Sequence, residues 1–286
     1  MKRLLAMALA LVMVLAMTAC GGEEEKTVKS GVEDGVLTVG MECAYAPYNW
    51  AQTDDSNGAV RISNFDGYAN GYDVMMAKKL CEANGWELEI KMLEWDSLVP
   101  AVMSGEIDCA IAGQSMTAER EKQVDFAGPY LYASIVVLTK ADSELASATG
   151  ISQLSGKCTS QSGTVWYDVC LPQIEGASIE SAQKDAPNML LALETGAVEF
   201  VCTDMPTAQG AVAAYPGMKI LDFSGTDGDF QFSEEVRAEN VNIGVSLMKG
   251  NTVLKEAIDK VLATMTVEDF NKLMAQAIEI QPLSED

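Results

Sequence analysis

The sequence predicts an α/β protein in which a wound β-sheet flanked by helices is built twice. From residue 36 onward, short apolar runs alternate with segments whose apolar residues recur at helical spacing, which is the pattern of βαβ units and parallel sheets. The alternation starts again after a polar break at 140–150. An apolar run at 240–248 and two amphipathic helical segments within 251–278 follow, and we expect that run to lead the chain back to the first sheet.

The first half of the chain supplies the elements of the first sheet. A buried strand is expected at 36–40, and residues 41–50 follow it as a loop. Residues 52–70 form a turn-rich insert that we interpret as solvated. A helix follows Gly71, because apolar residues recur there at helical spacing. Further strands are expected at 88–92, 107–112 and 133–138, and a further helix at 95–103.

The second half repeats the pattern after the polar break. Each apolar run is again short enough for a strand, and the segments between them carry helix and turn signals. Strands are expected at 158–161, around Ile179 and at 198–202, with helices at 188–193 and from Pro206 onward.

Composition restricts the classes of function. The chain has no histidine, which excludes Ser-His-Asp and Cys-His catalysis and His-ligated zinc sites. It carries 42 acidic and 19 basic residues, a formal net charge of −23, so nucleic acid is not expected as a partner, because phosphate binding needs the opposite sign. The six cysteines after Cys20 form no C-x-x-C pair, which favours buried thiols over a metal site and leaves disulfide pairing open. No cofactor is expected.

The N-terminus has the pattern of an export signal. Lys2 and Arg3 precede an apolar run that is too short to span a bilayer comfortably. The Ala19-Cys20 junction resembles a bacterial lipobox, in which Cys20 would be lipidated after cleavage, although Met17 stands where leucine is usual. We expect a lipoprotein signal peptide at 1–20 and a flexible tether at 21–34. An ordinary signal peptide with an incidental cysteine, or an uncleaved anchor, is the alternative.

A strand-to-helix turn in the first half is the candidate binding site. A short apolar run ends at Gly113, and Thr117 stands where a helix N-cap would be. Unpaired amides around Gly113 and Ser115 would favour an anion beyond the strand end. Arg120 lies in the first helical turn, where a cation opposes the helix dipole and invites a functional explanation. We interpret it as part of a carboxylate clamp; the alternative is an exposed arginine paired with Asp125 or a neighbouring glutamate.

The same residues carry a resemblance to a known family. Ser-Met-Thr-Ala-Glu-Arg at 115–120 and Val-Asp-Phe-Ala-Gly-Pro-Tyr at 124–130 resemble the ligand loop of the extracellular solute-binding proteins, family 3, which serve polar amino-acid ABC importers. In that family the arginine and the preceding amides hold the α-carboxylate of the amino acid. The resemblance places this role on Arg120, Ser115 and Gly113.

The resemblance also implies contacts in the first loop and after the second strand. Residues 40–48 resemble the family's first binding loop, in which an aromatic at the place of Tyr45 packs on the ligand, and Trp95 matches a pocket-lining position. Tyr45 and Trp95 would then enclose the substrate side chain; the alternative is that both rings belong to the core. Glu42, in the same loop, is expected near a basic side chain.

The second lobe is expected to supply the opposite charge. Asp204 follows the end of a predicted strand, where ligands of open α/β sheets bind, and the family places an acid there to receive the α-ammonium group. A plain helix N-cap is the alternative role for Asp204. The loop with Ser162 and Thr164 would add a hydroxyl and amides to the carboxylate.

The resemblance implies a two-lobed, type II periplasmic-binding-protein-like fold with two crossing segments as its hinge. Lobe 1 would comprise 35–135 and 240–286, and lobe 2 would comprise 136–239, each with a mainly parallel sheet. Residues 71–77 resemble the family's signature, except that Met75 stands where an acid is usual.

The expected function is extracytoplasmic binding of a polar amino acid, with a basic one slightly preferred, and its delivery to an ABC importer. The expected partners are a free amino acid, the permease subunits of the importer, and the membrane through lipid on Cys20, and a monomer is expected. Catalysis is not expected. Two alternatives stay open on the same fold: an enzyme similar to the periplasmic cyclic-acid dehydratases, and a ligand-sensing lipoprotein without a transport role.

Overall fold

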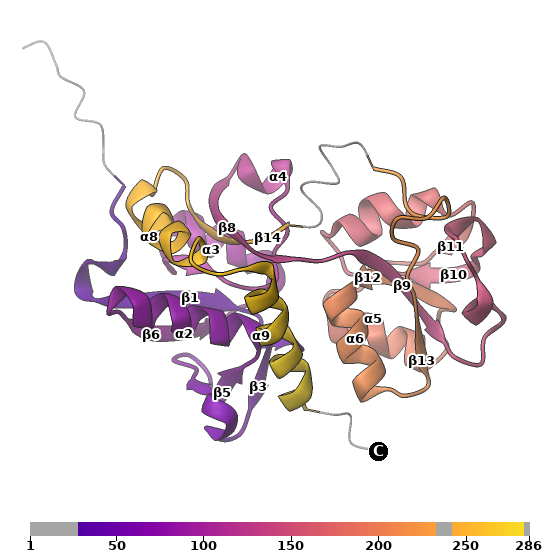
Figure 1. The fold of residues 1–286 in the computed structure, drawn as a ribbon, viewed down its shortest axis with the longest axis horizontal. Helices are drawn as coiled ribbons and strands as arrows, with labels where there is room; N and C mark the ends of the chain where they lie inside the picture. The colour runs from indigo at the N-terminus through magenta and orange to yellow at the C-terminus, as the bar shows by residue number, and fades with distance from the viewer. Residues whose placement is uncertain (1–27, 233–241, 283–286) are drawn as a thin grey trace, which may run out of the picture.

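The computed structural model describes residues 28–232 and 242–282, and it has two lobes, each built on a five-stranded sheet (Figure 1). The predicted two-lobed α/β fold is confirmed. The predicted signal peptide at 1–20, with its lipidation site Cys20, lies outside the described residues. The chain passes from lobe 1 to lobe 2 at residues 133–134 and has returned to lobe 1 by Asn242.

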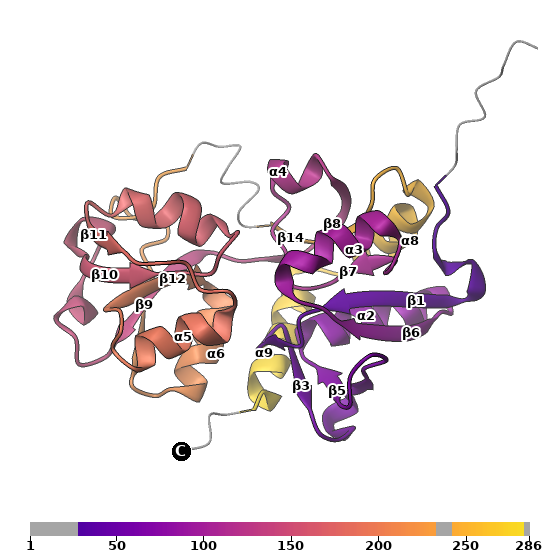
Figure 2. The same ribbon diagram turned by 180° about the vertical axis from the view of Figure 1, so that it is seen from behind.

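The lobe 1 sheet has the strand order β6-β1-β7-β14-β8. Its strands are β1 (Val36–Met41), β6 (Glu87–Met92), β7 (Cys109–Ala110), β8 (Val124–Tyr132) and β14 (Asn242–Met248). Its helices are α2 (Tyr72–Asn84), α3 (Leu98–Ser104), α4 (Ala118–Glu121), α8 (Thr252–Leu262) and α9 (Val267–Ile280). Helices α2 and α3 lie on opposite faces of this sheet (Figure 2). Helix α2 connects β1 to β6 and helix α3 connects β6 to β7, so the two right-handed crossovers run in opposite directions along the sheet and place their helices on opposite faces.

The lobe 2 sheet has the order β11-β10-β12-β9-β13. Its strands are β9 (Ile135–Lys140), β10 (Ser155–Thr159), β11 (Gly176–Ile179), β12 (Phe200–Asp204) and β13 (Met218–Leu221). Its longer helices are α5 (Ala186–Glu194) and α6 (Met205–Ala214), and short helical turns cover 144–153 and 166–173. Strand β13 and the turns at 166–173 had not been predicted.

Both sheets are more mixed than the prediction of mainly parallel sheets. In lobe 1, β1 pairs in parallel with β6 and β7, but β14 is antiparallel to β7 and β8. In lobe 2, β10 pairs in parallel with β11 and β12, but β9 is antiparallel to β12 and β13. The crossing segments explain this. The parallel strands run toward the other lobe, so a strand that arrives from the other lobe must run in the opposite direction.

A small third sheet extends lobe 1 and corrects two predictions. Residues 41–50, expected as a loop, contain β2 (Ala44–Tyr45) and part of β3 (Asn49–Gln52), while the insert 52–70 contains β4 (Val60–Arg61) and β5 (Tyr68–Asn70). These short strands pair antiparallel in the order β2-β3-β5-β4. The insert is therefore partly ordered as a sheet rather than a solvated turn.

The described part of the predicted tether is packed against lobe 1. Residues 32–34 form a short 3-10 helix, and the Ser30 carbonyl accepts a buried hydrogen bond of 3.0 Å from the Asn251 side chain. Ser30 itself is buried. Residues 30–34 therefore belong to the folded lobe, which corrects the expectation that the flexible segment extends to residue 34.

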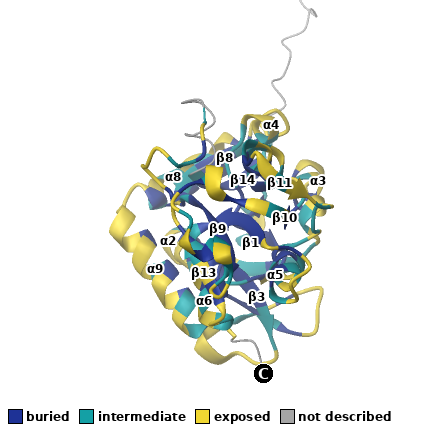
Figure 3. Cartoon of the chain, turned by 90° about the vertical axis from the view of Figure 1, so that its right-hand side faces the viewer, coloured by how far each residue is buried: buried dark blue, intermediate teal, exposed yellow. Residues whose placement is uncertain are grey.

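Each sheet is buried between helices whose outer faces are exposed (Figure 3). The largest fully buried side chains include three tyrosines, Tyr48, Tyr72 and Tyr130. Each of their hydroxyls donates a hydrogen bond inside the protein, as buried polar groups must. The six cysteines after Cys20 are all buried and unpaired, which confirms that they act as small apolar residues.

Two glycines at the ends of α2 allow a stability prediction. Gly71, before the helix, has φ 121°, and a Cβ atom there would lie 2.4 Å from the Tyr48 carbonyl oxygen. Gly85, after the helix, has φ 71°, but a Cβ atom there would have no atom within 4 Å. We expect Gly85→Ala to lower the free energy of unfolding by about 1 to 2 kcal/mol through backbone strain alone. Gly71→Ala should lower it by about 3 kcal/mol, because a backbone clash is added.

Urea denaturation of the two variants checks this expectation. Gly85→Ala serves as the matched control, since both positions have a positive φ and flank the same helix. Equal losses in the two variants would contradict the close approach of Gly71 to Tyr48.

Candidate ligand-binding site

A cavity of about 360 Å³ lies between the two lobes. Its walls come from the loops that follow β1, β6 and β7 in lobe 1 and β10 in lobe 2, the carboxyl ends of parallel strands, where open α/β sheets bind ligands. The lining residues are Tyr45, Trp95, Gly113, Ser115, Thr117, Glu119 and Arg120 from lobe 1 and Gln161, Gly163, Thr164, Val165, Trp166, Asp168 and Val169 from lobe 2.

Arg120 reaches across the cavity. Its Nη1 donates to the Ser115 carbonyl at 2.8 Å, and its Nη2 donates to the Gly163 carbonyl of lobe 2 at 3.2 Å. The guanidinium carbon lies 5.1 Å from the centre of the Trp95 ring, a cation-π contact. Both acceptors are neutral, and burial lowers the pKa of Arg120 to about 10. The guanidinium is therefore charged at neutral pH and keeps N–H donors beyond the two used here.

Arg120 does not form the alternative ion pair with Asp125 or a neighbouring glutamate. Asp125 lies 3.9 Å from Lys249 instead, and Glu119 lies 2.5 Å from Lys122. Among the ion pairs of the described residues, none includes Arg120. Thr117 caps α4 as predicted, because its Oγ1 accepts from the Arg120 amide at 3.3 Å. This cap fixes the backbone from which the guanidinium extends.

The two predicted aromatic residues line one cavity but do not face each other as a simple pair. Trp95 packs on Arg120, whereas the Tyr45 ring stacks on Tyr48 with centroids 4.7 Å apart. The Tyr45 side chain is also close to the Gly113 backbone. Both alternatives for Tyr45 thus hold together, since it is 2% exposed, packs in the core and still lines the cavity.

Two of the backbone amides expected to bind a carboxylate are used inside the protein. The Gly113 amide donates to the Tyr130 hydroxyl at 3.1 Å, and the Ser162 amide donates to the Gln183 carbonyl at 2.8 Å. Ser162 also does not line the cavity. Ser115 and Thr164 do line it, although the Thr164 hydroxyl donates to the Gln161 carbonyl at 2.7 Å. The partners of these amides come from distant segments that no local pattern indicates.

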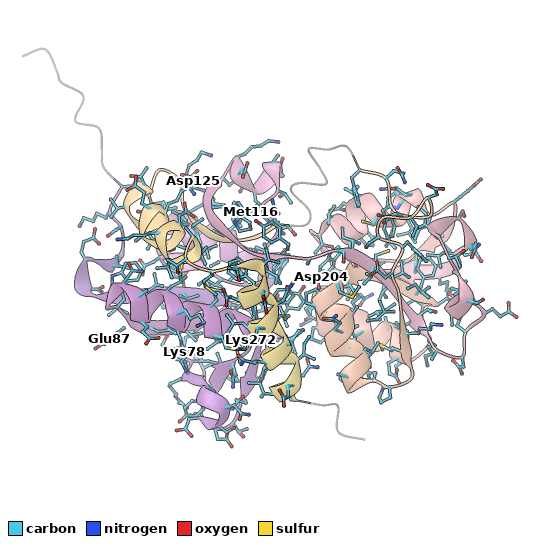
Figure 4. The ribbon with its side chains drawn as sticks, viewed as in Figure 1. Lys78, Glu87, Met116, Asp125, Asp204 and Lys272 are labelled. Carbon is cyan, nitrogen blue, oxygen red and sulfur yellow. The ribbon has the colours of Figure 1, made fainter. Side chains whose placement is uncertain are left out.

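Asp204 stands at the end of β12, on the side of lobe 2 that faces lobe 1 (Figure 4). Its Oδ1 accepts from the Thr207 amide at 2.8 Å, so it caps α6. Its Oδ2 accepts from the hydroxyls of Tyr45 and Tyr48, both of lobe 1, at 3.1 Å each. Burial raises the pKa of the Asp204 carboxyl, although these donors oppose the rise. Asp204 does not line the cavity itself, but it is hydrogen-bonded to Tyr45, which does.

Glu42 is not a lining residue, contrary to the expectation that it approaches a ligand side chain. It is 6% exposed, and its Oε2 has no hydrogen-bond partner within the described part of the chain. Burial, followed by the charges of Asp185, Glu94 and Asp73, raises the pKa of Glu42 to about 8. Glu42 therefore lies in an acidic environment beside the cleft rather than at the cavity wall.

Several lining residues were missed by sequence reasoning. Glu119 and Asp168 bring two exposed acids to the cavity, and Trp166 brings a third ring. Gln161 is buried, and its Nε2 has no partner among the described residues. Trp166 and Asp168 lie in a short helical turn without a capping or periodicity signal, so only their position after the loop at 162–164 could have indicated them.

The comparison with protein families decides the classification. The model of the bacterial extracellular solute-binding proteins, family 3, matches residues 37–278, which is most of the chain. The chain belongs to this family. The family 3 resemblance drawn from the ligand loop is thereby confirmed.

Individual amino-acid-binding proteins are similar to this chain over nearly the full length. A probable histidine-binding protein of Neisseria gonorrhoeae is 27% identical over 270 residues, which cover 91% of each chain. The L-cystine-binding protein TcyJ of Escherichia coli K12 is 26% identical over 257 residues, covering 90% of this chain and 87% of TcyJ. Among solved structures, the amino acid ABC transporter substrate-binding protein AbpA of Streptococcus pneumoniae, bound to L-arginine, matches with a TM-score of 0.71 and 26% identity, covering 88% of this chain and 98% of AbpA.

Two negative findings hold for the described ranges of this family 3 protein. Within 28–232 and 242–282, no helix has the length and apolar character needed to cross a membrane. In the same ranges, no group of three or more acidic or cysteine side chains is arranged to hold a metal ion.

Proposed function

We propose that this protein binds a polar amino acid outside the cytoplasm, with a basic side chain favoured, and delivers it to an ABC importer without chemical change. The observation that carries the proposal is Arg120. A charged guanidinium lies in a cavity between two lobes, bound only to neutral carbonyls among the described residues and with donors left over. A planar guanidinium is well suited to a carboxylate, which it binds through two parallel hydrogen bonds.

The second half of the clamp is Asp204, in the role of partner for the α-ammonium group. Arg120 belongs to lobe 1 and Asp204 to lobe 2, so a zwitterion interacts fully with both only when the lobes are together. Such a ligand favours the closed state by its differential affinity for the two states. Ser115 and Thr164 line the cavity beside Arg120 and are proposed to complete the carboxylate contacts.

The preference for a basic side chain rests on the charges of the cavity wall. Glu119 and Asp168 are exposed acids of the lining, one from each lobe, and their negative charges favour a cationic side chain in the cavity. The proteins named above bind histidine, cystine or L-arginine by their descriptions, which agrees with a polar amino acid as substrate. Glu42, beside the cleft, would add to the negative potential when it is ionised.

The cellular setting of the proposal follows from the N-terminus and the family. We propose a monomer that is exported by the signal at 1–20 and held at the membrane by lipid on Cys20, where it meets the permease subunits. Mass spectrometry of the protein purified from membranes checks this: a lipid-modified Cys20 at the mature N-terminus is expected, and release of an unmodified protein would contradict the anchor.

A binding screen tests the function. The mature domain is mixed with each of the twenty amino acids, and its thermal unfolding is followed. We expect the largest rise in midpoint with L-arginine, L-lysine or L-histidine, because a ligand that binds only the folded state stabilises it. The ligand is then recovered and weighed by mass spectrometry. A ligand recovered unaltered supports binding for transport, and a dehydrated product supports an enzyme. If no amino acid raises the midpoint, the protein binds another kind of ligand, which supports the sensor alternative.

A further inference from the structure

The hydroxyl of Tyr48 joins the two lobes at a charged group. Tyr48 belongs to lobe 1, is fully buried, and donates to Oδ2 of Asp204 in lobe 2 at 3.1 Å. The Tyr45 hydroxyl donates to the same oxygen at 3.1 Å, and it accepts from the Thr207 hydroxyl at 3.0 Å. Asp204 is 3% exposed, so nearly all of its stabilisation comes from these donors.

The hydrogen-bonding capacity of the carboxylate shows what these donors leave open. An ionised carboxylate has about four acceptor positions. Three are taken by the Thr207 amide and the two tyrosine hydroxyls. One position is left for a further donor such as an ammonium group, and a carboxylate held by three donors has little freedom to turn away from it.

The two tyrosines have different places relative to the cavity. Tyr45 lines it, whereas Tyr48 does not. An ammonium group that enters from the cavity thus meets the Tyr45 hydroxyl first and can replace it as a donor to Asp204. Tyr48 is expected to keep its bond in that event, because it is fully buried and does not line the cavity.

A group of packed aromatic rings fixes Tyr48 in place. Its ring centroid lies 4.7 Å from that of Tyr45, in a stacked pair, and 6.2 Å from that of Tyr72, in an edge-on pair, and Tyr72 is in turn stacked on Tyr130 with centroids 5.7 Å apart. The Tyr130 hydroxyl donates to Asp73 at 2.7 Å, at the start of α2. The Tyr48 hydroxyl is therefore carried by a rigid buried group that leads from the core of lobe 1 to the cleft.

We propose that Tyr48 is a positioning residue for ligand binding, whose hydroxyl orients the Asp204 carboxylate toward the α-ammonium group when the lobes close. The inference rests on the proposed function of Asp204. The bond is made between lobes and between protein groups, so it exists whenever the lobes are together, with or without a ligand, and it stabilises the closed state. Its loss should raise the rate of ligand dissociation and leave the rate of association nearly unchanged.

Tyr48→Phe is the test, because it removes only the hydroxyl and keeps the ring stack. Tyr167→Phe is the matched control: it removes a hydroxyl that donates at 2.9 Å to the Glu180 carbonyl within lobe 2. With L-arginine as the probe at pH 7, Tyr48→Phe should lower affinity about tenfold through faster dissociation, since one hydrogen bond to a charged group is lost. Tyr167→Phe should change affinity less than twofold.

A pH profile separates positioning from a general loss of packing. The titratable groups that face Asp204 are Tyr45 and Tyr48, with Asp73 as a more distant acid. The Tyr48 hydrogen bond lowers the pKa of Asp204, so its removal should move the acid limb of L-arginine binding to higher pH. Tyr167→Phe should leave that limb in place. Equal affinities and equal acid limbs in the two variants would overturn the inference.

The outcomes also separate this inference from the proposed function. If the wild-type protein binds no amino acid, the proposed function fails. Small-angle scattering without ligand then tests whether the Tyr48 hydroxyl holds the two lobes together. In that case Tyr48→Phe should enlarge the radius of gyration relative to Tyr167→Phe, and equal radii would overturn the inference. If the wild type binds L-arginine, the comparison of the two variants decides on Tyr48 alone.

Discussion

Replacing Arg120 by alanine should weaken amino-acid binding by about 2 to 5 kcal/mol, the loss expected when one partner of a buried charge pair is removed. In affinity this is roughly thirtyfold to several thousandfold. In the wild type, the Ser115 and Gly163 carbonyls accept hydrogen bonds from the Arg120 guanidinium. In the variant, the ligand carboxylate would be enclosed between the lobes and would face these carbonyls, which repel an anion. Titration calorimetry with L-arginine measures the change. Arg120→Lys should lie between wild type and alanine, because it keeps the charge and loses the planar fork.

Two controls make the Arg120 prediction specific. Arg61→Ala removes the same charge from an exposed position in the small sheet, where Arg61 lies 2.8 Å from Asp66, and it should leave affinity unchanged. Agmatine, which is arginine without its carboxylate, should bind wild type and Arg120→Ala with similar weak affinity. An Arg120→Ala variant that binds L-arginine as tightly as wild type does would contradict the clamp.

The sequence could predict those features of the fold and site that depend on local patterns. Strand β1 was expected near its observed bounds, and helix α2 was expected after Gly71, where it begins, because a short apolar run and a helical spacing of apolar residues are both local signals. Thr117 was expected as a helix cap, and a cap was the alternative role given to Asp204; both residues cap helices. Arg120 stood out because it breaks a local rule, and it is the residue that reaches across the cavity.

The features that the sequence could not predict depend on partners far along the chain. Strand β8 was missed: it spans a Gly-Pro pair and is defined by its pairing with β14, over a hundred residues later. The Gly113 amide was assigned to a ligand because nothing nearby indicates that Tyr130 takes it. The strands of the small sheet have only two to four residues, too few for an alternation to be visible.

The location of Glu42 shows the same limit in electrostatics. From sequence it is one acid in a binding loop, and a role near a basic ligand was a reasonable expectation. In the fold it is buried beside Glu94 and Asp96 of its own lobe and Asp185 of the other. Acids that are distant in sequence thus set its protonation, and its main effect is expected on stability rather than at the cavity wall.

Glu42 should make the protein less stable as pH rises from about 4.5 to about 8. Its pKa is raised from 4.5 to about 8 in the folded state, so between these values the folded chain binds one more proton than the unfolded chain. Stability falls with pH wherever the folded state holds the extra proton. The full shift corresponds to at most roughly 4 to 5 kcal/mol. The contribution of Glu42 to the free energy of unfolding is constant below about pH 4.5, where both states hold the proton, and constant again above about pH 8, where both have lost it.

Urea unfolding of wild type and Glu42→Gln at a series of pH values tests this. Burial also raises the pKa of Asp73, to about 7, so its own effect of the same sign ends near pH 7 and the interval from pH 7 to 8 isolates Glu42. Wild type should lose stability across that interval, and Glu42→Gln should not, because an amide does not titrate. Glu82→Gln, which removes an exposed acid from α2, should follow wild type. If the curves of Glu42→Gln and wild type stay parallel from pH 4.5 to 8, Glu42 is ionised in the folded protein throughout, and the like charges around it must be separated by more solvent than the closed lobes allow.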